Sequence, residues 1–131
     1  MKKQGILNAA LSNIIAGMGH TDLLVVADAG LPIPPGVPVI DLALRCGVPS
    51  FADVLSAVAD ELQVEQIVIA AEAQQSGDPL PEVTAALFPG VPVAACPHEE
   101  FKQRTTRARA VVRTGECTPY HNVILQAGVV F

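Results

Sequence analysis

Residues 23–28, Leu23-Leu24-Val25-Val26-Ala27-Asp28, are the stretch that decides how the fold is interpreted. Five consecutive apolar residues followed by a carboxylate are typical of a strand buried on both faces of a parallel sheet. A second apolar run, residues 66–71, ends at Glu72, and a third, residues 91–96, precedes His98. The sequence therefore predicts a sheet whose strands end in polar groups.

Helical segments alternate with these strands. Asn8 is the expected N-cap of a first helix that Gly19 terminates, and Ser50 with Asp53 forms a capping-box-like start for a second helix, through Leu62. Two more helices are expected over residues 81–88 and 98–106, a polar turn over 74–79, and further strands over 39–44, 110–113 and 123–126. The fold class is therefore α/β, a single domain over residues 1–131 with a mainly parallel sheet flanked by helices.

Composition narrows the class of partner. The chain has 131 residues, a net charge of −5 and 50% hydrophobic residues. The acidic balance argues against nucleic acid, which needs a basic footprint, and the few arginines between residues 104 and 113 are interpreted as a solvated face or as subunit contacts. No apolar run is long enough for a membrane span. We expect a cytoplasmic protein with no nucleic-acid or membrane partner.

The cysteines and the glycine patterns indicate neither a disulfide framework nor a cofactor. Cys46, Cys96 and Cys117 form no C-x-x-C pair and are odd in number, which favours a reducing compartment without disulfides or a zinc site. The chain contains neither a G-x-G-x-x-G motif nor a P-loop, so no nucleotide cofactor is predicted.

Polar groups cluster in a few short segments. A Gly- and Pro-containing turn presents Tyr120, His121 and Asn122 just before an apolar strand. Phenol, imidazole and amide groups together can donate to and accept from a polyhydroxylated ligand. Ligands of open α/β sheets collect beyond the carboxyl ends of the strands, so a polar cleft is expected near Asp28 and His98.

Four motifs occur in a recognisable order: Gly19-His20, Ala27-Asp28-Ala29-Gly30-Leu31-Pro32, His98-Glu99-Glu100-Phe101 and Arg113-Thr114-Gly115-Glu116. With them the chain resembles the D-ribose pyranase family, relatives of the fucose mutarotases, over essentially its whole length. The resemblance implies an isomerase that interconverts the β-pyranose and β-furanose forms of D-ribose by general acid–base ring opening, without cofactor or metal.

The resemblance also implies roles for individual residues. His20 is the expected catalytic group, and the expected substrate-binding residues are Asp28, His98, Lys102, Tyr120, His121 and Asn122. Imidazole titrates near neutrality, which suits proton transfer in both directions. The residues alone leave other roles open, because His20 can be a surface histidine at a helix end and Asp28 can start a turn through an Asx bond, or orient His20.

The remaining candidates have similar alternatives. His98 can be a helix N-terminal residue held by Glu99 or Glu100, and Lys102, one helical turn later, can be a solvated side chain. If residues 120–122 are extended, the His121 ring points the opposite way from its neighbours, so we expect it to contribute its backbone.

Oligomerisation is a further implication of the resemblance. It implies a cyclic homo-oligomer, a decamer of stacked pentameric rings with sites at subunit boundaries. In this arrangement His98 and Lys102 serve the Asp28, Tyr120 and Asn122 of a neighbouring copy.

Three alternative functions stay open. They are a fucose-type mutarotase, a non-catalytic sugar-binding accessory of transport, and a metal hydrolase. The last would use His20, His98, His121, Asp28 and Asp41, although their spacing matches no H-x-x-x-H or H-E-x-x-H helix.

Overall fold

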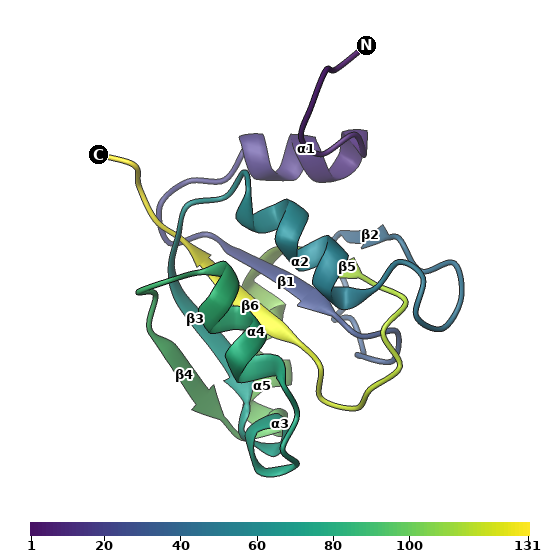
Figure 1. The fold of residues 1–131 in the computed structure, drawn as a ribbon, viewed down its shortest axis with the longest axis vertical. Helices are drawn as coiled ribbons and strands as arrows, with labels where there is room; N and C mark the ends of the chain where they lie inside the picture. Colours follow the sequence, from purple (N-terminus) through teal and green to yellow (C-terminus); the bar gives the residue numbers. More distant parts are fainter.

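A six-stranded sheet forms the centre of the computed structural model, which describes all residues 1–131 (Figure 1). Its strands are β1 (Leu23–Ala27), β2 (Val39–Asp41), β3 (Val64–Ala70), β4 (Val93–Cys96), β5 (Ala108–Arg113) and β6 (Val123–Ala127). Their order across the sheet is β2-β5-β1-β6-β3-β4. The α/β class and the mainly parallel sheet are confirmed.

One strand runs against the others. β1, β2 and β5 pair in parallel, as do β3 and β4, whereas β6 lies antiparallel between β1 and β3 and joins the two groups. The carboxyl ends of β1, β3, β4 and β5 therefore lie at one edge of the sheet, and β6 begins at this same edge. We call it the carboxyl edge.

Helices cover both faces of the sheet (Figure 1). On one face the apolar side chains of α1 (Ala9–Ala16), α2 (Phe51–Ala59), α3 (Ala71–Gln75) and α4 (Leu80–Leu87) join a core cluster of 21 buried residues. On the other face a cluster of nine buried residues includes Phe101 of α5 (His98–Arg104), which the 3₁₀ turn η1 (Thr105–Arg107) follows. Burial of these aliphatic side chains supplies the main driving force for folding.

Both predicted N-caps are confirmed. The Asn8 side chain accepts a hydrogen bond of 2.9 Å from the Leu11 N–H, and the Ser50 hydroxyl accepts one of 3.1 Å from the Asp53 N–H. The helix ends differ from the prediction. α1 ends before Gly17, whose own N–H caps the last turn, and α2 ends at Ala59 because the chain turns there to bury Leu62 in the core.

The predictions for two other segments were wrong. Residues 71–75 form the short helix α3, where the end of a strand and a polar turn were expected. Alanine, glutamate and glutamine are good helix formers, and this turn buries Ala73 completely. β2 ends at Asp41 instead of continuing to residue 44, because Arg45 and Val48 form an isolated bridge in a separate loop.

The expectation of no disulfide is corrected. Cys46 and Cys117 are joined by a disulfide, with 5.8 Å between their Cα atoms, and Cys96 is free and buried. The two residues are 71 positions apart in sequence, and the packing of two loops brings them together. A count of cysteines and their local spacing carries no information on such a contact.

None of the helices combines the length and the apolar character required to span a bilayer.

Replacement of Gly115 by alanine should destabilise the fold. A Cβ at this position would lie 2.5 Å from the Arg45 carbonyl oxygen and from the backbone nitrogen and oxygen of Val48. Backbone atoms cannot yield as a flexible side chain does, so we expect Gly115→Ala to lower the free energy of unfolding by about 1–3 kcal/mol in urea denaturation.

Gly19→Ala is the matched control, because its Cβ would meet only the Asp22 carboxylate at 3.9 Å. Equal stability of the two variants would contradict the close approach of the loops at Gly115.

Candidate functional site

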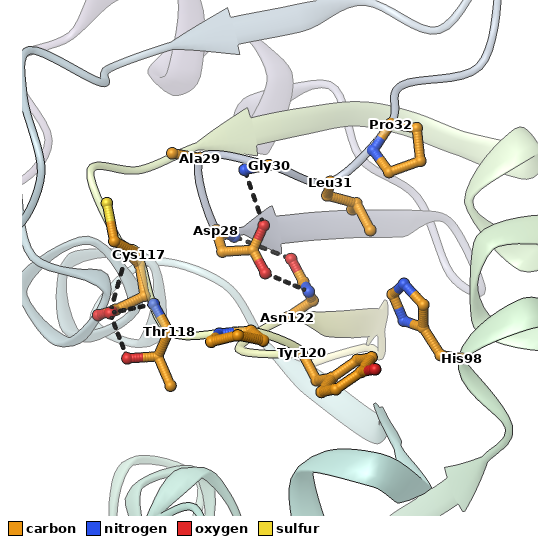
Figure 2. A pocket seen from close by; sticks show the side chains of 12 residues that line it. Asp28, Ala29, Gly30, Leu31, Pro32, His98, Cys117, Thr118, Tyr120 and Asn122 are labelled. Carbon is orange, nitrogen blue, oxygen red and sulfur yellow. Dashed lines mark hydrogen bonds between the residues drawn. The ribbon is translucent and has the colours of Figure 1, made fainter.

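A cleft of about 550 Å³ opens at the carboxyl edge (Figure 2). It is lined by residues 28–32, His98, residues 116–120 and Asn122. The topology gathers these segments, because the segment after β1, the start of α5 after β4, and the connection from β5 to β6 all lie at this edge. The cleft predicted near Asp28 and His98 is therefore present.

Asp28 and Asn122 form the floor of the cleft through two reciprocal hydrogen bonds. The Asn122 amide oxygen accepts from the Asp28 backbone N–H, and the Asn122 amide nitrogen donates to Asp28 Oδ2, each at 2.8 Å. The other carboxylate oxygen, Oδ1, accepts from the Gly30 N–H at 2.9 Å, so the predicted Asx bond is formed. The two side chains are thus held in fixed positions, and the carboxylate keeps unused lone pairs.

The rings of His98 and Tyr120 form one side of the cleft, while Cys117 and Thr118 lie on the other side of Asp28 and Asn122 (Figure 2). The centroids of the His98 and Tyr120 rings are 5.0 Å apart in an edge-to-face arrangement. The His98 Nδ1 atom is buried and has no hydrogen-bond partner. A buried polar atom without a partner is costly, which sets this nitrogen apart from the other buried side-chain atoms.

Glu72 sets the position of His98. Both of its carboxylate oxygens accept from the His98 backbone N–H, at 2.9 and 3.1 Å. This hydrogen bond holds the pKa of the Glu72 carboxyl below its usual value. The helix start is therefore held by Glu72 rather than by Glu99 or Glu100. Sequence reasoning had placed Glu72 at a strand end but had not linked it to His98.

The turn at residues 116–118 was missed as part of the site. Glu116 Oε1 accepts from the N–H groups of Cys117 and Thr118, each at 3.0 Å, and from the Thr118 hydroxyl at 2.9 Å. Although partial burial by itself raises the pKa of the Glu116 carboxyl, these hydrogen bonds leave it below its usual value. The Gly115-Glu116 motif was visible in the sequence, but nothing in it showed that the carboxylate would close a turn.

His121 points away from the cleft and does not line it, so its expected place among the substrate-binding residues is corrected. The segment is not extended as the alternation argument assumed, because Tyr120 lies in a turn with a φ of 64°. The His121 Nδ1 lies 3.0 Å from Asp78 Oδ1, and the exposed fractions of the two side chains are 11% and 5%. Its ring also packs edge-to-face on Phe51, with 4.5 Å between centroids. His121 therefore fixes the backbone of the turn from below, while Tyr120 and Asn122 face the cleft.

His20 does not line this cleft. It precedes β1, whereas Asp28 follows it, so the five residues of β1 separate them by about 15 Å. The exposed His20 ring bonds to Glu65, with 2.9 Å from Nε2 to Oε2. The alternative in which Asp28 orients His20 within one chain is excluded, because the two residues lie at opposite edges of the sheet.

Two further expectations need correction. His98 shares a cleft with Asp28, Tyr120 and Asn122 of its own chain, so it does not need to serve those of a neighbouring copy. Lys102 does not line the cleft, since its ammonium group pairs with Glu99 at 2.6 Å on the surface of α5.

No group of three or more histidine, cysteine, aspartate or glutamate side chains is placed to hold a metal ion. Of the five residues of the metal-hydrolase alternative, Asp41 pairs with Arg113 and His121 with Asp78.

Comparison with known proteins agrees with this geometry. The model of the RbsD / FucU transport protein family matches residues 1–130. The chain belongs to this family. It is 56% identical to the D-ribose pyranase of Symbiobacterium thermophilum and 50% identical to that of Bacillus subtilis, in both cases over the full length of both chains.

Solved structures of the RbsD / FucU family have the same fold. The structure of Bacillus subtilis RbsD complexed with D-ribose matches with a TM-score of 0.95, 50% identity and complete coverage of both chains. The fucose mutarotase of Streptococcus pneumoniae in complex with L-fucose matches with a TM-score of 0.70 at 22% identity over 95% of each chain, which shows the shared fold.

Removal of the Asn122 side chain should damage both the fold and the cleft. Asn122→Ala leaves the buried Asp28 N–H without an acceptor, which costs about 1–3 kcal/mol of unfolding free energy, and it frees the carboxylate to move. We expect weaker binding of ribose in an NMR titration. Asn8→Ala, which removes a helix cap at a cost of about 1 kcal/mol, is the control and should leave ribose affinity unchanged.

The link between Glu72 and His98 predicts a pH dependence. Because the folded-state pKa of Glu72 lies below its ordinary value of 4.5, the bond contributes fully above that value and is lost as the pH falls through the folded pKa. The stability difference between wild type and Glu72→Gln in urea should therefore be constant near neutrality and shrink in acid. A difference that does not change with pH would contradict the role of the Glu72 charge.

Proposed function

We propose that the chain is a D-ribose pyranase that interconverts the pyranose and furanose forms of ribose. The observation that carries the proposal is a pre-formed polar cleft in a chain that is 50–56% identical to D-ribose pyranases over its full length. The similarity to the ribose complex of Bacillus subtilis RbsD supports the same ligand.

The cleft offers the groups that a monosaccharide requires. The Asp28 carboxylate accepts from sugar hydroxyls, the His98 imidazole at the wall of the cleft bonds a further hydroxyl, and the Tyr120 ring packs against an apolar face of the sugar. Because Asn122 and Glu72 already hold Asp28 and His98, binding requires little reordering.

Ring opening is a proton-transfer reaction. A base removes the proton of the anomeric hydroxyl, a carbonyl forms at C1, and an acid protonates the ring oxygen as its bond to C1 breaks. Attack by a different hydroxyl then closes the ring in its other size, and the protons return by the reverse route. Groups that titrate near neutrality suit both directions, and no metal or nucleotide takes part.

We assign the proton transfer to His20 of a neighbouring copy. Within one chain His20 lies at the edge opposite the cleft, exposed and oriented by Glu65, whose own side chain is bonded to Gln126 at 2.7 Å. A head-to-tail contact between copies would place the His20 edge of one against the cleft of the next. Repetition of such a contact closes into a ring when the rotation between copies is a whole fraction of a turn.

The surface beside His20 fits such a contact. The Thr21 N–H bonds to the Ala127 carbonyl, so the apolar tail Val129-Val130-Phe131 begins close to His20. Phe131 is fully exposed in a single chain. We infer a homo-oligomer, in its complete form a decamer of stacked pentameric rings, that acts in the cytoplasm on free sugar.

Proton NMR exchange spectroscopy on D-ribose at equilibrium tests the reaction. Wild-type protein should add pyranose–furanose exchange, and His20→Ala should reduce the added rate by about 10²–10⁴-fold, the usual contribution of a positioned acid–base group. If wild type adds no exchange for ribose while it still binds the sugar, the chain is a binding protein.

Co-assembly of two inactive variants tests the source of His20. Subunits with His20→Ala keep an intact cleft, and subunits with Asn122→Ala keep His20. If His20 acts between copies, each site needs an intact cleft from one copy and an intact His20 from the next. Random co-assembly of equal amounts in a head-to-tail ring therefore restores about one quarter of the sites. Asp28→Asn serves as a second cleft variant, and His20→Ala mixed with His20→Asn is the control that should stay inactive. Failure of both cleft variants to restore activity would contradict the assignment.

A further inference from the structure

Two loops meet at the rim of the cleft, and a cysteine of each joins them. Cys117 lines the cleft, whereas Cys46 belongs to the loop after β2 and lies outside it. The backbones of the loops are also tied, because the Gly47 N–H donates to the Gly115 carbonyl at 2.6 Å and the Gly115 N–H donates to the Pro49 carbonyl at 2.9 Å. Gly115 is therefore fixed with or without the disulfide.

Residues 116–120, which we call the rim, make few other bonds to the rest of the protein. The Glu116 carbonyl accepts from the Ala29 N–H at 2.8 Å, but the Glu116 side chain bonds only within its own turn. Residues 117–120 are exposed, and the next firm anchors are the buried His121 and Asn122. The Cys46–Cys117 bond is thus the one covalent tie across this part of the cleft wall.

Small molecules in solution can react with the two sulfur atoms. Cys46 and Cys117 are both exposed, so low-molecular-weight thiols and disulfides can reach the pair. The third cysteine, Cys96, is buried, and burial raises the pKa of its thiol, which makes it unreactive by comparison. Exchange is therefore directed to the pair at the rim.

We propose that Cys46 and Cys117 form a reversible thiol–disulfide site. Small disulfides oxidise this pair and thereby control the affinity of the cleft for sugar, and glutathione disulfide is the probe used to test it. In the oxidised form the rim is ordered before sugar binds. In the reduced form residues 117–119 must be ordered on binding, which raises the KM for ribose. The effect on sugar affinity rests on the proposed function.

The thiol–disulfide exchange between the two cysteines and glutathione disulfide needs no other reactant. One cysteine thiolate attacks glutathione disulfide, forms a mixed disulfide and releases one glutathione thiolate. The second cysteine thiolate then displaces the other glutathione, which closes the Cys46–Cys117 bond. The two cysteines are oxidised by two electrons and lose two protons, and one glutathione disulfide becomes two thiols.

The test compares the oligomeric protein equilibrated in oxidised and in reduced glutathione buffers. Mass spectrometry after alkylation counts the free thiols, and NMR exchange on ribose gives the KM of each form. We expect the reduced form to have a KM higher by about 3- to 10-fold with little change in kcat, as the ordering of one or two side chains on binding would produce. Hydrogen exchange of residues 116–120 should be faster in the reduced form.

Variants separate the pair from the rest of the chain. Cys46→Ser lies outside the cleft and should have the KM of the reduced form in either buffer, whereas Cys96→Ser should keep the full redox response. Equal KM values and equal hydrogen exchange in the two wild-type forms would overturn the proposal, as would a redox response retained by Cys46→Ser. If neither form catalyses exchange of ribose, the proposed function fails, and hydrogen exchange at the rim still decides the redox proposal.

Discussion

The hydrogen-bonded pair of Asp28 and Asn122 is the interaction on which the site depends. A buried carboxylate and a buried amide are tolerated only when their hydrogen bonds are made, and here each satisfies the other while Gly30 takes the remaining carboxylate oxygen. The pair can form only because β6 runs antiparallel beside β1, so that the start of one strand meets the end of the other. The direction of one strand therefore determines which residues become neighbours in the cleft.

In the proposed reaction, the binding of sugar and the transfer of protons belong to opposite edges of the sheet. The groups proposed to recognise hydroxyls follow β1, β4 and β5 at the carboxyl edge, and the histidine proposed for the chemistry precedes β1 at the opposite edge. Under this proposal a single chain carries both halves of a site at places that cannot meet. Association of copies in one direction turns this separation into a repeating set of complete sites, so in this arrangement assembly is a condition of activity.

Local features of the sequence predicted much of this structure. The caps at Asn8 and Ser50 and the strand before Asp28 follow from neighbouring residues, and they were predicted correctly. Features that depend on contacts distant in sequence were not. The Cys46–Cys117 bond and the support of His98 by Glu72 depend on strand order, which no periodicity encodes. The distance of His20 from Asp28, in contrast, follows from the strand that was predicted between them. The helix α3 was missed because burial of Ala73 outweighed the polar composition around it.

The central position of β6 has a consequence for synthesis on the ribosome. Its partners β1 and β3 are made first, yet they have no contact in the sheet until residues 123–127 are inserted between them. The nascent chain therefore exposes two unpaired strand edges until this segment has emerged. Pairing over about a hundred residues of separation is slow, and exposed edges favour association with other chains. The nascent chain is therefore most prone to association with other chains before residues 123–127 have emerged.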